Sequence, residues 1–105
     1  MPLRTRTNDP TVLILTSLAD GPRHGYALVQ DIEAFAGVTL GPGTLYGALA
    51  RLEGRGLIEA LPADDRRRPY QLTGTGRAAL SDQLRVLERV ARSGLARLQV
   101  AEVPR

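Results

Sequence analysis

The fold of this 105-residue chain is decided by residues 40–58, which read Leu40-Gly41-Pro42-Gly43-Thr44-Leu45-Tyr46-Gly47-Ala48-Leu49-Ala50-Arg51-Leu52-Glu53-Gly54-Arg55-Gly56-Leu57-Ile58. Pro42 begins a helix, because proline at the first helical position loses no backbone hydrogen bond. Gly54 and Gly56 end the helix, since glycine readily takes the left-handed conformation that closes helices. Apolar side chains recur between these ends at i, i+3, i+4 and i+7, which predicts one buried stripe made of Leu45, Ala48, Leu49 and Leu52.

The opposite face of this helix is nearly bare. At about 100° per residue, the residues opposite the stripe are Gly43, Gly47, Ala50 and Gly54. One shoulder of the bare face carries Thr44, Arg51 and Arg55, and the other carries Tyr46. Gly inside a helix lowers its stability by roughly 1 kcal/mol relative to Ala. A solvated helix gains nothing from this loss, whereas a helix that must lie close to another surface does. Arginine at its edge suits a phosphate-lined surface, whereas the alternative is a solvated surface helix with small residues.

The composition of the chain limits the classes of protein to which it can belong. The length predicts one domain, and 43% hydrophobic with 24% charged residues is ordinary for a globular protein. There is no Cys, which excludes disulfides and thiolate metal sites. All 14 basic residues are Arg, so a P-loop, which needs Lys, is excluded. The net charge of +3 favours an acidic partner. With no transmembrane window and no signal peptide, we expect a cytoplasmic protein.

The segment before residue 40 predicts a polar arm and two helices. Residues 1–8 are the expected arm, and Asn8 or Asp9 caps a short apolar helix that stops at Asp20-Gly21-Pro22. A second helix is expected to open at Arg23-His24-Gly25 and to fade at Ala36-Gly37. The sole histidine, His24, has no partner at catalytic or metal spacing and is interpreted as a helix-start or surface residue. The core is expected to contain Leu13, Leu28, Leu45, Leu49, Leu52, Leu57 and Leu72.

After the central helix, the sequence predicts a β-hairpin. Residues 57–61 form one strand candidate, Pro62-Ala63-Asp64-Asp65 is turn-like, and residues 66–72 return as the second strand. Pro69 is expected to require an edge strand. The hairpin carries Arg66, Arg67 and Arg68, which suit contact with phosphates or the minor groove of DNA.

The last segment predicts a long helix with a coiled-coil-like seam. It follows Thr73-Gly74-Thr75-Gly76, and its apolar positions recur at alternating spacings of four and three. The seam consists of Leu80, Leu84, Leu87, Ala91, Gly94 and Leu98. So small a domain leaves such a helix little intramolecular surface to cover, which favours a second copy of the chain as its partner. The alternative is a helix folded back on its own domain.

The order helix, helix, turn, helix, hairpin and long helix describes a winged helix-turn-helix: a mainly α fold with a small β-hairpin and a long C-terminal helix. We expect a DNA-binding domain over residues 8–73 and a dimerisation helix over residues 74–105. At this point the sequence resembles the PadR-type winged-helix transcriptional regulators. The resemblance is carried in order and spacing by residues 18–28, 41–53, 56–58, 67–73 and 76–80.

The resemblance implies a homodimer, usually a repressor, whose helix around residues 44–53 enters the major groove. It implies that Tyr46 contacts the DNA backbone and that the hairpin of Arg66–Arg68 reaches phosphates or the minor groove. The single last helix is similar to that of the short subgroup, in which it makes much of the dimer. Members often respond to small molecules such as phenolic acids or drugs. Two alternatives therefore stay open: a regulator that responds to a small-molecule effector, and a regulator that has no such ligand.

The residues also depart from the family. Gly41 stands where many members have Ser, Gly47 where Pro is frequent, and Pro69-Tyr70 where two tyrosines are usual. The expected DNA contacts are Gly43, Thr44, Tyr46, Arg51, Arg55, Arg66, Arg67 and Arg68, and the expected dimer contacts are Leu80, Leu84, Leu87, Ala91 and Leu98. Few of the side chains on the bare face can read bases, so much of the specificity is expected from DNA shape and half-site spacing.

Competing classes have weaker support. No nucleophile signature or dinucleotide fingerprint is present. We therefore expect no catalytic activity, no cofactor and no bound metal. The alternative function is a winged-helix module that binds protein instead of DNA. Loss of basic residues from the third helix and the wing would favour that module, and they are retained here.

Overall fold

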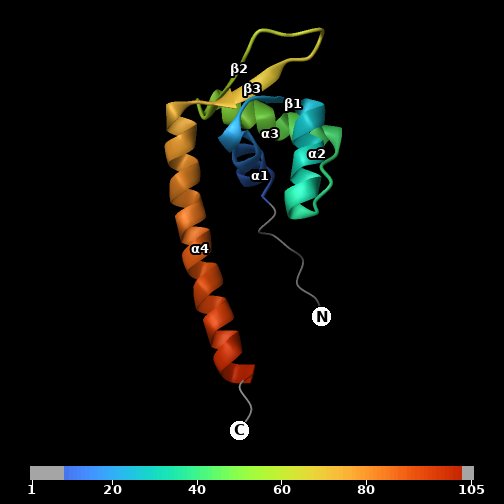
Figure 1. Ribbon diagram of the computed structural model, residues 1–105. Helices are drawn as coiled ribbons and strands as arrows, with labels where there is room; N and C mark the ends of the chain where they lie inside the picture. Colours follow the sequence, from blue (N-terminus) through green and yellow to red (C-terminus); the bar gives the residue numbers. More distant parts are fainter. Residues whose placement is uncertain (1–8, 103–105) are drawn as a thin grey trace.

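The computed structural model describes residues 9–102, in which a small helical domain is followed by one long helix (Figure 1). The elements are α1 (Pro10–Ser17), the 3₁₀ turn η1 (Leu18–Asp20), β1 (Arg23–His24), α2 (Gly25–Ala36), α3 (Pro42–Gly54), β2 (Ile58–Ala60), β3 (Pro69–Leu72) and α4 (Gly74–Glu102). The expected fold class is confirmed. The arm expected at residues 1–8 and the chain end at residues 103–105 lie outside the described residues.

Helix α1 lies at the centre of the core. Asp9 caps it by accepting a hydrogen bond from the Thr11 N–H (2.9 Å), and Pro10 occupies its first turn. Four consecutive residues, Val12 to Leu15, are buried because α1 contacts α2, α3 and α4. Of the seven leucines expected in the core, five are buried and two, Leu57 and Leu72, pack against it half-buried.

The sheet contains a strand that the sequence did not predict. Arg23 and His24, expected to open the second helix, form β1 instead and pair with Tyr70 and Pro69 of β3. Helix α2 therefore begins at Gly25, where the His24 ring nitrogen Nδ1 accepts a hydrogen bond from the Ala27 N–H (3.4 Å). His24 is thus both the last residue of β1 and the N-cap of α2, so its expected position at a helix start is confirmed while Arg23 belongs to the strand alone.

Strand β3 is central, in the order β1-β3-β2, so the expectation that Pro69 needs an edge strand is wrong. Pro69 is the first residue of β3, a position that tolerates the missing N–H. Its carbonyl still takes part in the ladder by accepting from the Leu61 N–H (2.8 Å).

An arginine holds the start of β1 against the preceding helix. Arg23 donates to the Ser17 carbonyl, pairs with Asp20 at 2.7 Å and lies 3.8 Å from Asp31. The guanidinium, through its hydrogen bond and charge, holds the pKa of the Asp20 carboxyl below its usual value. The Ser17 hydroxyl is buried and donates to Asp31 at 2.6 Å. These contacts tie the end of α1 to α2.

The hairpin between β2 and β3 turns later than the sequence predicted. Asp64 and Arg67 exchange two backbone hydrogen bonds, of 2.7 and 2.9 Å. Asp65 (φ 52°) and Arg66 (φ 71°) are the central residues, and positive φ at both is the arrangement of a type I′ turn. The turn therefore contains an arginine, and Arg66 lies at the tip of the wing, by which we mean residues 61–69.

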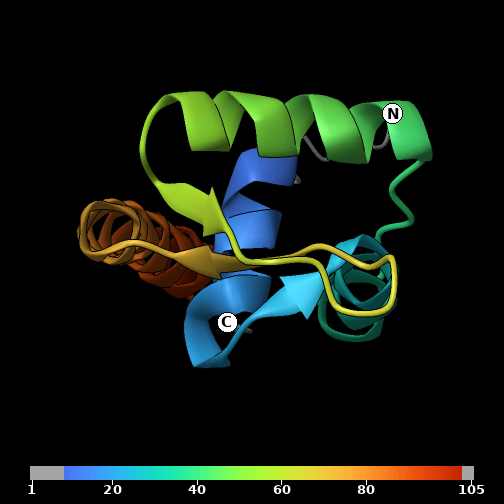
Figure 2. The ribbon, with the colours of Figure 1, turned by 90° about the horizontal axis from the view of Figure 1, so that it is seen from above.

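Helix α3 ends in a Schellman motif. Gly56 takes a left-handed φ of 75° and its N–H donates to Glu53, while the Leu57 N–H donates to Leu52; both bonds are 3.0 Å long. The expected end at Gly54 and Gly56 is confirmed: Gly54 is the last residue of α3, and Gly56 takes the left-handed conformation that closes it. The chain turns sharply there into β2, so the wing lies alongside α3 (Figure 2).

Helix α4 leaves the domain and extends well beyond it, giving the molecule a longest dimension of 62 Å (Figure 1). Leu80 is buried in the core, but the apolar residues that follow it between Leu84 and Leu98 are exposed. In the described residues, α4 does not fold back on its own domain.

Candidate nucleic-acid interface

The exposed face of α3 is bare, as its sequence predicted. Leu45, Ala48, Leu49 and Leu52 are buried beneath it. A Cβ atom placed on Gly43 or Gly54 would have no neighbour within 4 Å among the described residues. The glycines therefore do not serve packing within the chain, and the face is open to close approach by another molecule.

Arginines border this bare face without carboxylate partners. Thr44, Arg51 and Arg55 are all exposed on one shoulder, and the Arg51 guanidinium lies 3.7 Å from the position of a Cβ on Gly47. Within residues 9–102, neither Arg51 nor Arg55 forms an ion pair. Their charges are available to an external anion.

Tyr46 occupies the other shoulder, and its ring contacts the start of α2. The side chain is 56% exposed, yet its hydroxyl oxygen would lie 2.7 Å from a Cβ atom on Gly25. Gly25 is itself buried. The two helices approach this closely because Gly25 has no side chain.

The wing supplies the second group of cations. Arg66, Arg67 and Arg68 are all exposed, and in the part of the chain that the structure describes none pairs with a carboxylate. Together with α3 and the start of α2, the wing encloses a cleft of about 270 Å³. Its lining residues are His24, Gly25, Tyr26, Tyr46, Arg66, Arg67, Arg68 and Tyr70.

The structure thus divides the expected contacts into two groups. Tyr46 lines the cleft with the three wing arginines, whereas Thr44, Arg51 and Arg55 lie on the far shoulder of α3 and do not. Besides Gly25, the cleft is lined by three further side chains that were not singled out from the sequence as contacts: His24, Tyr26 and Tyr70. No sequence signal placed His24 and Tyr26 at the cleft, because they are brought there by the pairing of β1 with β3, which the sequence did not predict.

Tyr70 is the half-buried member of this group. Burial raises the pKa of its phenol, and the Glu53 carboxylate raises it further, against an opposing effect of Arg68. The Tyr70 hydroxyl therefore stays protonated at neutral pH and is able to donate a hydrogen bond into the cleft.

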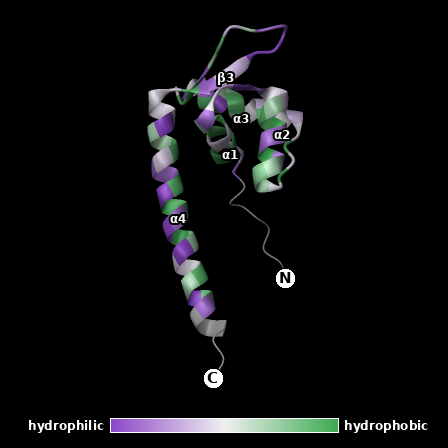
Figure 3. Cartoon of the chain, in the orientation of Figure 1, coloured by the Kyte–Doolittle hydropathy of each residue, from purple (hydrophilic) through white to green (hydrophobic). Residues whose placement is uncertain are grey.

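The expected dimer residues lie on α4, away from the cleft. Leu80 is only 4% exposed and belongs to the core of the domain, whereas Leu84, Leu87, Ala91 and Leu98 are exposed. Apolar and polar residues alternate along the projecting helix (Figure 3). The apolar seam that is accessible therefore begins at Leu84.

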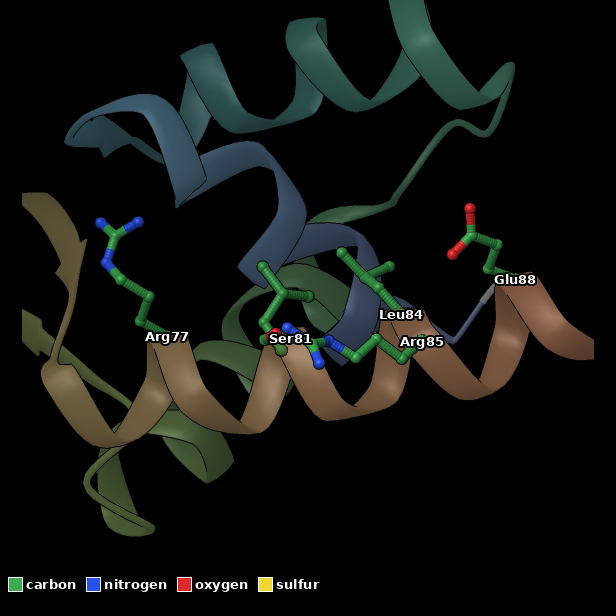
Figure 4. Close-up of a pocket in the computed structure, with 6 residues that line it drawn as sticks. Arg77, Ser81, Leu84, Arg85 and Glu88 are labelled. Atoms are coloured by element: carbon green, nitrogen blue, oxygen red, sulfur yellow. The ribbon is translucent and has the colours of Figure 1, made fainter.

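A shallow hollow of about 490 Å³ lies along α4 where the helix passes α1 (Figure 4). Leucines provide its apolar part and charged side chains its rim; the lining residues are Arg77, Leu80, Ser81, Leu84, Arg85 and Glu88. Arg77 donates a hydrogen bond of 3.4 Å to the carbonyl of Ala19, the middle residue of η1.

Within residues 9–102, no helix is both long and apolar enough to cross a membrane. No group of three or more His, Asp or Glu side chains in this part of the chain is placed to hold a metal ion.

Known proteins resemble the chain over most of its length. Residues 14–82 match the model of the family described as transcriptional regulator PadR-like. The transcriptional regulator Rv3488 of Mycobacterium tuberculosis is 45% identical over 85 residues, which cover 78% of each chain. An uncharacterized 37.1 kDa protein in transposon TN4556 of Streptomyces fradiae is 49% identical over 86 residues, or 82% of this chain but 25% of that protein. The chain therefore spans about a quarter of the length of the transposon protein.

A solved structure agrees with this result. The crystal structure of a PadR family transcription regulator from hypervirulent Clostridium difficile R20291 aligns with a TM-score of 0.69 at 26% identity. The alignment covers 82% of this chain and 97% of that chain.

Proposed function

Because the chain belongs to the PadR-like family of transcriptional regulators, we propose that it is a dimeric repressor that binds operator DNA in the cytoplasm through its winged helix. Residues 8–73 bind DNA in this proposal, and residues 74–105 hold two copies together. The observation that carries it is the bare face of α3, bordered by arginines that have no ion-pair partner within the described residues.

Helix α3 acts as the recognition helix, with its bare face in the major groove. The N–H groups of Gly43 and Thr44 lie in its first turn, where a helix favours a phosphate. The hydroxyls of Thr44 and Tyr46 add hydrogen bonds to the DNA backbone. Arg51 reaches a phosphate or a guanine edge, and Arg55 contacts backbone.

The wing completes the contact. Arg66, at the tip, and Arg67 and Arg68 behind it bind phosphates or enter the minor groove. This role of the wing is supported by the cleft, which its three arginines line together with Tyr46 of α3. DNA held by α3 would therefore pass within reach of the wing. His24, Tyr26 and Tyr70 line the same cleft and provide further donors to the backbone of the DNA.

A second copy of the chain covers the seam of α4. Leu84, Leu87, Ala91 and Leu98 are exposed on a 29-residue helix that makes few contacts with its own domain beyond Leu80. Isolated exposure of so many large apolar groups is unfavourable in water. Two such helices bury each other's seams, and a two-fold dimer then presents two recognition helices to a palindromic operator.

An effector, if the protein has one, is best placed at the hollow beside α4. Its volume of about 490 Å³ is in the range of small-molecule sites, and Leu80 and Leu84 offer apolar surface beside the Arg77 and Arg85 cations. Because Leu84 lines the hollow and also begins the exposed seam, a small molecule bound there would change how two seams pack and so change the distance between the recognition helices. Release of DNA by phenolic acids in a binding assay tests this part of the proposal.

The DNA-binding proposal is tested by titrating binding with salt, on random-sequence duplex and on the DNA upstream of the protein's own gene. Each phosphate that the protein neutralises adds about 0.9 to the slope of log affinity against log salt. We expect a steep slope with clear preference for the upstream DNA, and a smaller slope for Arg51→Ala. Arg89→Ala, an exposed arginine of α4, is the matched control that leaves both unchanged. Absence of binding to either DNA at low salt would instead favour the protein-binding module.

A further inference from the structure

The first turn of α4 is attached to the end of the recognition helix by hydrogen bonds centred on Thr73. The Thr73 hydroxyl donates to the Gly56 carbonyl (2.7 Å) and accepts from the Gly76 N–H (3.0 Å). The Thr73 N–H donates to the Leu57 carbonyl (3.1 Å). Gly56 and Leu57 are the residues that close α3, so one side chain joins the end of α3 to the beginning of α4. Figure 2 places both at the same side of the domain.

The two backbones touch at this joint. Gly76 is buried, and a Cβ atom on it would lie 1.8 Å from the carbonyl oxygen of Leu57. The obstacle is backbone rather than a flexible side chain, so no rotamer change relieves it. The first turn of α4 therefore has very little freedom to slide or tilt relative to the end of α3.

The other side of the same turn is held by the core. Arg77 donates to the Ala19 carbonyl, and Leu80 is buried against α1. The direction of α4 is thus set by contacts with α3 at one side and with α1 and η1 at the other. Everything beyond Leu84 projects freely from this base (Figure 1).

We propose that Thr73 is a positioning residue that sets the distance and angle between the two recognition helices of the dimer, and hence the half-site spacing that the protein prefers. The inference rests on the proposed function, since it needs DNA binding by α3 and dimerisation through α4. Half-sites of helix-turn-helix dimers lie about 34 Å apart, one turn of DNA. A small tilt at the base of a helix this long produces a large displacement at the seam, so the joint determines which spacing fits.

The experiment compares the preferred spacing of wild type with that of Thr73→Val and Thr73→Ser. The operator is first obtained by selecting bound duplexes from a random library with the wild-type protein. Affinity is then measured on palindromes whose half-sites are moved apart or together one base pair at a time, and on a single half-site. Valine keeps the shape of threonine but removes both side-chain hydrogen bonds, whereas serine keeps the hydroxyl.

We expect wild type and Thr73→Ser to share a sharp spacing optimum. For Thr73→Val, the ratio of affinities at the optimal and neighbouring spacings falls by about two- to tenfold, the effect of losing one or two hydrogen bonds. Affinity for the single half-site stays unchanged, which a general loss of folding would not allow. Circular dichroism at the assay temperature confirms that each variant is folded.

A folded Thr73→Val protein with the wild-type spacing profile overturns the inference and leaves the proposed function intact. A wild-type protein that selects no DNA overturns both. If Thr73→Val does not fold, Thr73→Ala carries the test, because it removes the same hydroxyl and both of its hydrogen bonds. An unchanged spacing ratio in a folded Thr73→Ala protein then overturns the inference.

Discussion

The Tyr46 hydroxyl lies so close to Gly25 that a Cβ atom on that glycine would be 2.7 Å from the oxygen. The contact joins the start of α2 to the outer shoulder of α3 and holds the phenol at the rim of the cleft that the wing arginines line. Because Gly25 has no side chain, the hydroxyl of Tyr46, a proposed DNA contact, is able to lie at this position.

We predict that Gly25→Ala weakens DNA binding while leaving the fold nearly intact. The new methyl group displaces the Tyr46 ring, which is free to swing because it is more than half exposed. The free energy of unfolding should therefore fall by less than about 1.5 kcal/mol. Loss of one hydrogen bond to the DNA backbone lowers affinity by about two- to tenfold. Denaturant unfolding and fluorescence anisotropy with operator DNA measure the two effects.

The matched control is Tyr46→Phe, which removes the hydroxyl and relieves the close contact. If Gly25 acts through Tyr46, the two substitutions are coupled. The variant that combines Gly25→Ala with Tyr46→Phe then binds DNA no more weakly than whichever single variant has the lower affinity. Additive losses of affinity would show that Gly25 has a separate role.

Gly47→Ala is predicted to separate stability from binding. A Cβ at this position meets Arg51 at an ordinary contact distance of 3.7 Å, so the free protein accommodates it. Alanine in the middle of a helix raises the free energy of unfolding by about 0.5–1 kcal/mol. The same methyl group keeps α3 away from the groove floor, and operator affinity falls. Equal affinity in a stabilised variant would identify the bare face as ordinary solvated surface.

A substitution at the wing tip is also predicted to separate the stability of the protein from its DNA binding. Arg66 has a left-handed backbone in a two-residue turn where Asp-Gly is favoured, so Arg66→Gly should fold at least as stably as wild type. It should nevertheless lower the salt slope of DNA binding by about 0.9, the contribution of one phosphate. Arg66→Lys keeps the charge and should keep the slope. If all three proteins give the same slope, the tip does not touch a phosphate.

Periodicity explains which parts of this molecule are readable from sequence. The stripe of Leu45, Leu49 and Leu52 repeats with the helical period, so both the buried and the bare face of α3 were predicted correctly. Strand β1 has only two residues, too few to show alternation, and its partners lie in β3, far along the chain. Its formation depends on tertiary structure, as does the central place of Pro69.

The same distinction applies to the site. The charge and face of Arg51 and Arg55 follow from their place on one helix. The cleft does not, because His24, Tyr46 and Tyr70 come from three separate elements that meet only in the folded domain. The turn centred on Asp65-Arg66 lies two residues later than predicted, since arginine is not a residue that signals a left-handed turn.

Gly76→Ala should be strongly destabilising, in contrast to its neighbour. A Cβ at Gly76 would lie 1.8 Å from the Leu57 oxygen, whereas one at Gly74 has no neighbour within 4 Å among the described residues. Because backbone must move, we expect Gly76→Ala to lower the free energy of unfolding by about 3 kcal/mol or more. Gly74→Ala should change it by less than about 1 kcal/mol. Thermal unfolding of both variants followed by circular dichroism makes the comparison, and similar melting temperatures would mean that the joint yields easily.

Leu87→Asp should convert a dimer into a monomer. Leu87 is exposed in the single chain, so its replacement should not reduce the helicity of the subunit. In the proposed dimer it faces the partner helix, where an unpaired carboxylate without water costs several kcal/mol. Arg89→Asp introduces the same aspartate side chain about 200° further around α4, with a larger change in net charge, and should leave the dimer intact. Sedimentation equilibrium gives the mass of each species. A Leu87→Asp protein that remains dimeric places the interface elsewhere, whereas a monomer that also loses its preference for palindromic over single half-sites ties operator recognition to the seam.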